Sequence, residues 1–306
     1  SPASDVYKRQ LYTNRSSLTE RNIRLRLLPL AALLASMSLP AMTAPVLAQA
    51  LPPAPPQPGD GPEDARLKRL FHESDEASLA RNPVSGIFRG DMRRADRLGD
   101  FFSDSYIAAE RAAAQKDLAE LGRIDRSKLT PTDQIAYDVF RNQTDMALKG
   151  LDPAIVALTI VRPMDHFYGI QTFYPEFASG QGAAPFNTVV DYENNLKRNV
   201  EYARMLDEAI GRFRQGMKTG VVQPKLVVRN MIAQFDNLLA GTPEDSTFYA
   251  PVKTFPAAIA PADRTRLTAA YTAQVRDVIV PAQRRMRDFL AATYLPAARD
   301  SVGLSG

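Results

Sequence analysis

Apolar residues at helical spacing fill the last part of the chain and constrain its fold more than any other feature. They recur every three or four positions, at Leu267, Tyr271, Val275, Val278, Ala282, Met286, Phe289 and Thr293. Such spacing places one apolar face on an α-helix. We therefore expect a long helix from Pro261 to about Tyr294. We expect a kink at Pro281, because proline lacks a backbone donor and clashes with the preceding turn.

Helical patterns or helix start signals also occur in five earlier segments, at residues 63–80, 103–121, 130–149, 188–215 and 224–239. The clearest start is Thr130 at the N-cap position, followed by Pro131 at the first helical position. Residues 151–163 instead contain the run Ile-Val-Ala-Leu-Thr-Ile-Val, which favours a single strand or a buried extended segment. The sequence therefore predicts an all-α fold, a multi-helix array with a kinked long C-terminal helix and at most a minor extended segment.

Residues 21–50 have the three regions of a secretory signal peptide. Three arginines precede an apolar stretch at 27–39, and the segment ends in Ala48-Gln49-Ala50. We expect cleavage after Ala50 and export to the periplasm or the medium. We expect no stable membrane anchor, because the apolar stretch is shorter than the ~20 residues that a membrane-spanning helix requires. An uncleaved anchor is the alternative interpretation.

The segments on either side of this leader differ in composition. Residues 1–20 are polar and open with Ser rather than Met, so we interpret them as a non-native or mis-annotated leader. Residues 51–62 contain six prolines and are predicted to form an extended spacer. Residues 63–306 form the predicted helical domain.

Charge and composition exclude several classes of function. The chain has 38 basic and 34 acidic residues, but residues 1–50 hold six of the former and two of the latter, which leaves 32 of each in 51–306. A neutral body carries no general basic field, so we expect no nucleic-acid partner. The chain has no cysteine, which excludes disulfides, thiolate metal sites and cysteine nucleophiles.

The two histidines of the chain lie in different contexts. His72 begins the run His72-Glu73-Ser74-Asp75-Glu76, but a metallopeptidase helix needs a second histidine where Glu76 stands. A charged, solvated helix face explains this run better. His166 lies in Pro-Met-Asp-His-Phe-Tyr-Gly, and we take His166, Tyr168 and Tyr174 as candidate substrate-binding residues in an aromatic-lined pocket. The alternative is a histidine packed among aromatic rings. No catalytic residue and no metal ligand can be assigned.

Four groups of residues, in the same order, resemble motifs of the DUF885 family of exported bacterial proteins. They are Arg81-Asn82-Pro83-Val84 with Phe88-Arg89-Gly90-Asp91; Leu129–Asp138; Asp191–Leu196 with Met217–Lys225; and Val280-Pro281-Ala282 with Tyr294–Arg299 and Val302-Gly303-Leu304. Asn195 stands where the family usually has arginine. The resemblance runs from about Leu67 to the end of the chain.

The resemblance implies a function but supplies no catalytic residues. Members of this family look like helical zinc metallopeptidases of the gluzincin type, with an H-E-x-x-P-G-H helix and a later E-G-W segment. This sequence has neither, so no zinc ligand is carried over and we expect no cofactor in this chain, whereas zinc is expected in the intact family member.

Two hypotheses follow from this resemblance. The first is the N-terminal half of an exported zinc-dependent peptidase, inactive alone, whose partners are a peptide substrate and the missing C-terminal half of the same domain. The second is a non-catalytic exported helical module that binds peptides or serves as a scaffold.

Overall fold

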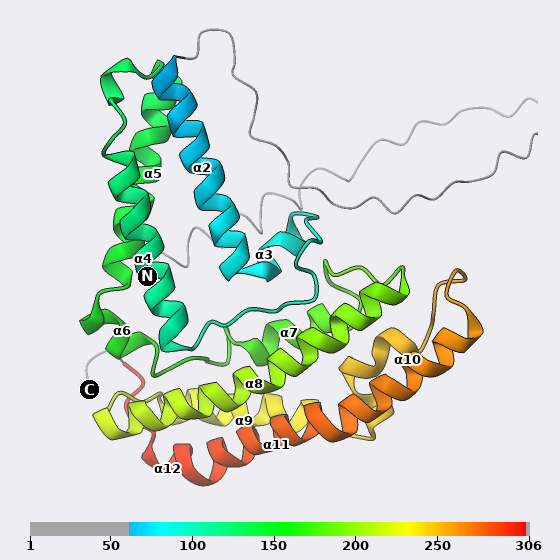
Figure 1. Ribbon diagram of the computed structural model, residues 1–306. Helices are drawn as coiled ribbons and strands as arrows, with labels where there is room; N and C mark the ends of the chain where they lie inside the picture. Colours follow the sequence, from blue (N-terminus) through cyan, green and yellow to red (C-terminus); the bar gives the residue numbers. More distant parts are fainter. Residues whose placement is uncertain (1–60, 304–306) are drawn as a thin grey trace, which may run out of the picture. The chain divides into compact units, whose positions relative to one another are not determined.

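The computed structural model describes residues 61–303, and within that range the chain forms helices joined by loops, with no β-strand (Figure 1). The predicted all-α class is therefore confirmed. The polar leader at 1–20, the signal peptide at 21–50 and nearly all of the spacer at 51–62 lie outside the described residues.

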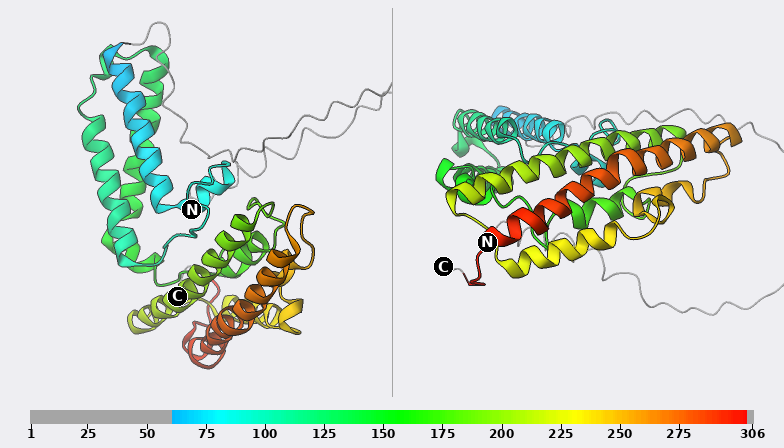
Figure 2. Two further views of the ribbon diagram at one scale, coloured as in Figure 1. Left: turned by 45° about the vertical axis from the view of Figure 1, so that its right-hand side comes forward. Right: turned by 90° about the horizontal axis from the view of Figure 1, so that it is seen from below.

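Three helices at the start of the described range pack side by side (Figure 2). They are α2 (Pro62–Arg81), α4 (Asp104–Leu121) and α5 (Pro131–Gly150), with the short helix α3 (Pro83–Phe88) after α2 and the 3₁₀ turn η1 (Arg126–Lys128) before α5. Leu67, Leu70, Leu121, Ile124, Leu129 and Tyr137 form the core between them. The predicted starts are correct, because the side chains of Ser103 and Thr130 accept hydrogen bonds from backbone amides of the first turns of α4 and α5.

The second group of helices contains the largest core. Its main members are α8 (Val189–Thr219), α9 (Lys225–Leu238) and the C-terminal run, which consists of α10 (Pro261–Gln274), α11 (Val280–Phe289) and α12 (Leu295–Ala297) with the turns between them. The middle of that run packs against both α8 and α9, and Figure 2 shows the three lying alongside one another. The helix α7 (Ile170–Ala178) and the 3₁₀ turns η2 (Pro243–Asp245) and η3 (Thr247–Val252) complete the group.

The long C-terminal helix is distorted where the sequence predicts a kink. A π-helical turn at Val275–Ile279 ends two residues before Pro281, and a second at Leu290–Tyr294 ends two residues before Pro296. A proline removes the donor that a regular helix needs, and a π turn is one way to re-arrange the hydrogen bonds before it. The helical path therefore continues through both prolines instead of stopping at them.

The predicted strand within 151–163 is wrong, because these residues contain the helix α6 (Pro153–Thr159). Asp152 is its N-cap, with Oδ1 accepting from the amide of Ala154 at 2.8 Å, and Pro153 occupies the first helical position. This local start signal outweighs the β-propensity of the valine and isoleucine residues that follow it. The segment is also not buried, since most residues of α6 are exposed.

Candidate functional site

The loop that carries His166 connects α6 to α7 and is folded around Asp165. Its Oδ1 accepts hydrogen bonds from the amides of Phe167 and Tyr168, both at 2.6 Å, and the Asp165 amide donates to the carbonyl of Tyr168 at 2.9 Å. Asx turns of this kind use the carboxylate to hold the backbone, so Oδ1 of Asp165 is engaged by the amides of its own loop.

Three glutamines attach this loop to the rest of the helical core. Gln171 Nε2 donates to the carbonyl of Asp165 at 2.7 Å, Gln234 Nε2 to that of His166 at 2.8 Å, and Gln223 Nε2 to that of Met164 at 3.1 Å. A Cβ at Gly169 would lie 2.1 Å from Gln171 Oε1, so the glycine leaves room for this buried side chain. The loop is thus held by α7, by α9 and by the segment that precedes α9.

His166 and Tyr168 are partly exposed in this loop, whereas Tyr174 is not. The His166 ring packs on Phe167 with centroids 4.0 Å apart, and its buried Nδ1 has no hydrogen-bond partner among the described residues. Tyr168 is 63% exposed. Tyr174 is fully buried: its hydroxyl donates to Asn199 Oδ1 at 2.9 Å, and burial raises its pKa. The structure therefore brings two of the three candidate residues together and places the third in the core.

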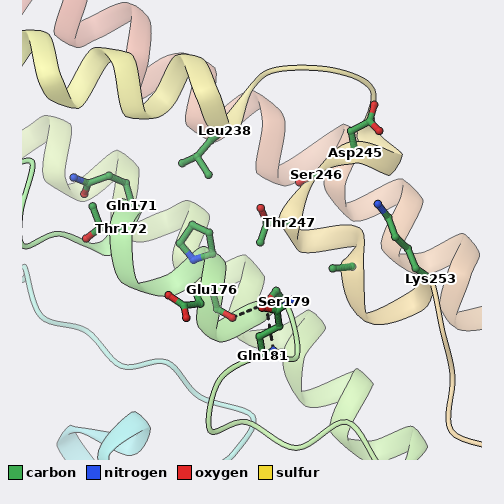
Figure 3. A pocket seen from close by; sticks show the side chains of 12 residues that line it. Gln171, Thr172, Glu176, Ser179, Gln181, Leu238, Asp245, Ser246, Thr247 and Lys253 are labelled. Atoms are coloured by element: carbon green, nitrogen blue, oxygen red, sulfur yellow. Dashed lines mark hydrogen bonds between the residues drawn. The ribbon is translucent and has the colours of Figure 1, made fainter. Parts of the chain in front are cut away.

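A groove of about 440 Å³ lies between α7 and η3, beside the anchored end of the loop (Figure 3). Gln171 contributes both to this groove and to the attachment of the His166 loop. Figure 3 shows Thr247 and Leu238 across the groove from α7, with Glu176 and Lys253 on opposite sides of the view. The groove therefore combines hydroxyl and amide groups with charges of both signs.

The third charge in the groove, Asp245, is committed to its own turn. Its Oδ2 accepts from the amide and the hydroxyl of Thr242, both at 2.9 Å, and these bonds lower its pKa. The groove residues include one cation, Lys253. Of their two carboxylates, Glu176 is exposed and does not cap a turn, so it is the one available to a ligand. Sequence reasoning missed this groove because its residues come from α7, the end of α9 and η3, which no local motif connects.

The charged run after His72 lies on α2 and is partly buried, with Glu73 as its one exposed residue. Arg93 holds Glu76 in a two-bond ion pair at 2.7 and 2.9 Å and lowers the pKa of that carboxyl, while Arg89 pairs with Asp75. Within residues 61–303, no three histidine or acidic side chains are placed to hold a metal ion. The described residues therefore do not fit a zinc site, and no chemical step involving zinc can be derived from them.

Two of the segments that carry the family resemblance meet in space beside the His166 loop. Lys225 donates its amide to the carbonyl of Arg299 at 2.9 Å, and the amide of Gln223 donates to the hydroxyl of Tyr294 at 2.9 Å. A salt bridge of 2.8 Å between Lys225 and Asp300 closes the same contact. The start of α9 is thus fixed to the end of the C-terminal helix and, through Gln223, to the loop.

Comparisons with known proteins agree with this fold. The model of a family described as "Bacterial protein of unknown function (DUF885)" matches residues 83–305. A crystal structure from Colwellia psychrerythraea, described as a "putative lipoprotein", is similar, with a TM-score of 0.64 and 14% sequence identity. The match covers 79% of this chain and 43% of that one, so this chain spans less than half of its length. At this identity the likeness concerns the fold alone.

A search of curated proteins gives no match. In the part of the chain that the structure describes, every helix is too short or too polar to cross a lipid bilayer.

Proposed function

The chain belongs to the DUF885 family, and from this membership we propose that it forms the substrate-side helical part of an exported zinc-dependent peptidase. The family match over residues 83–305 is the observation that carries the proposal. In this proposal the zinc is bound by the H-E-x-x-P-G-H part of the family domain, which these residues do not include. The greater length of the similar crystal structure, of which this chain covers 43%, is consistent with further helices in such a domain.

The peptide binds, in this proposal, in the groove between α7 and η3. The exposed hydroxyl of Thr247 can donate to or accept from a peptide backbone, and Leu238 provides an apolar contact. The hydroxyls of Thr172 and Ser179 already donate to the carbonyls of Gly169 and Glu176. Glu176 and Lys253 can meet charged groups of the peptide. Gln171, which lines the groove, also holds the His166 loop through the carbonyl of Asp165, and in this proposal the exposed Tyr168 of that loop extends the binding surface.

The first experiment is to sequence the gene beyond the codon for Gly306. We expect the reading frame to continue into an H-E-x-x-P-G-H helix, and we expect the protein encoded by that frame to hydrolyse peptides. A chelator should abolish the hydrolysis and added Zn²⁺ should restore it. A stop codon at that position, together with peptide binding by this chain, would instead establish the alternative, a non-catalytic exported peptide-binding module.

A prediction about Lys253 tests whether the groove itself binds peptide. Replacing Lys253 by alanine is expected to weaken the binding of peptides with a free C-terminal carboxylate by about fivefold, the effect of one exposed ion pair. Calorimetric titration of the chain with such peptides measures it. Amidated peptides should bind both forms equally, and the control Lys218→Ala, an exposed lysine at the end of α8, should bind like the unmodified chain. Equal affinities of Lys253→Ala and the unmodified chain for the free-acid peptide would place the peptide elsewhere.

A further inference from the structure

The helix α6 exposes an apolar surface that the proposed peptide site does not use. Residues 153–161 contain no charged side chain, and the exposed fractions of Ile155 and Leu158 are 44% and 52%. Ala154 and Ala157 are also exposed, so aliphatic groups cover most of this short helix. Contiguous exposed apolar residues of this kind are a feature of contact surfaces, and the charges around them decide which partner fits.

Cationic groups lie at both ends of this helix. The exposed Lys149 precedes it, and a guanidinium nitrogen of Arg111 donates to the carbonyl of Leu151. After the helix, Arg162 donates from Nε and Nη2 to the carbonyl of Leu158 at 3.2 and 3.1 Å. The one acidic residue between 149 and 162 is Asp152, the N-cap. Together with Arg111, this segment carries a net positive charge around an aliphatic centre.

We propose that α6 is a docking surface for anionic lipid, binding reversibly at the membrane–water interface. Aliphatic side chains enter the boundary between headgroups and acyl chains, while lysine and arginine remain at the level of the phosphates. Protein interfaces are instead enriched in aromatic residues and methionine, of which residues 149–162 contain none. A seven-residue helix buries little apolar area, so the binding is weak and depends on the anionic charge of the lipid.

The chain has no cysteine, so a dye attached to one introduced cysteine reports only the environment of α6. The variant Ala157→Cys, labelled with the environment-sensitive dye NBD, is mixed with vesicles of phosphatidylcholine that do or do not contain phosphatidylglycerol. We expect a blue shift and a rise of emission with the anionic vesicles and a much smaller change with phosphatidylcholine alone. The matched control is the labelled variant Ala119→Cys, at an exposed position near the C-terminal end of α4. Its emission should stay constant when vesicles are added.

Two further substitutions, each added to the labelled Ala157→Cys chain, test the roles of the aliphatic and cationic side chains. Adding Leu158→Glu should weaken the partitioning measured at position 157 by about tenfold, because it removes an exposed aliphatic group and adds a charge. Adding Lys149→Glu should weaken it by a few fold. Both positions are exposed, so we expect neither substitution to disturb folding, and unchanged circular dichroism spectra would verify this.

Three outcomes would overturn the proposal. One is no emission change at position 157 with anionic vesicles. Another is an equal change with neutral and anionic vesicles, which removes the role of the cations. The last is a change without lipid that grows with protein concentration, accompanied by a doubled mass in light scattering, which would identify a second copy of the chain as the partner.

Discussion

Replacing Gly216 by alanine is expected to lower the free energy of unfolding by about 2 kcal/mol, although alanine favours helices more than glycine does. A Cβ at Gly216 in α8 would lie 2.5 Å from the carbonyl oxygen of Val221 and 3.0 Å from that of Val161. Both are backbone atoms, so α8 or the two segments must move. Overpacking lowers the free energy of unfolding by about 3 kcal/mol, and the higher helix propensity of alanine raises it by about 1 kcal/mol. Denaturant unfolding of the chain measures the difference.

A matched control lies in the same helix. Gly211 is exposed, and nothing lies within 4 Å of a Cβ placed there. The variant Gly211→Ala should therefore raise the free energy of unfolding by about 1 kcal/mol, the opposite sign. Stabilisation by both substitutions would mean that the segments around Val161 and Val221 yield easily, contrary to the packing described above.

This pair of glycines also shows a limit of the sequence pattern. Gly216 and Gly220 both suggest the end of the helix that the sequence predicts for 188–215. In the structure α8 continues to Thr219, and Gly220 alone ends it, with a left-handed φ of +77°. Gly216 stays inside the helix because two other segments approach its backbone. A glycine required for close packing and one required for a turn look the same in a single sequence.

The long helices could be predicted because their signals are local. Apolar spacing and the caps at Ser103 and Thr130 depend on residues within one or two turns, and these helices begin where expected. The sequence of α6 favours a buried extended segment because its side chains are apolar, whereas Asp152 followed by Pro153 is a local start signal for the helix that the structure contains. Burial depends on what packs against a segment, and the sequence of the segment does not contain that information.

The candidate site was predictable only in part, for the same reason. His166 and Tyr168 share one loop because they are close in the sequence. Tyr174 lies one turn into α7, on the side that faces Tyr202 of α8, with the two rings stacked 4.9 Å apart. The glutamines that attach the loop come from three separate segments. A lone glutamine gives no sign of such a role until the fold places it.

Replacing Asp64 by asparagine is expected to lower the free energy of unfolding by about 2 kcal/mol at neutral pH. The buried carboxylate accepts from the amide of Gly61 at 2.8 Å and from that of Thr130 at 2.9 Å, so it joins the starts of α2 and α5. Asparagine keeps one acceptor and turns its NH₂ group towards the other amide. The control Asp138→Asn removes an exposed pair with Arg126 and should change stability by less than about 0.5 kcal/mol.

The same carboxylate gives this prediction a pH dependence with a defined sign. The hydrogen bond from Thr130 is the main reason that the pKa of Asp64 falls from 3.8 to about 2. A carboxyl whose pKa is lower in the folded state stabilises the protein above its unfolded pKa, and this contribution disappears as the pH falls towards the folded value. The stability difference between the unmodified chain and Asp64→Asn should therefore be constant above about pH 5 and shrink between about pH 4 and pH 2. Unfolding curves across this range, read against Asp138→Asn, measure it, and an undiminished difference at the lowest pH would show that Asp64 does not act through its charge.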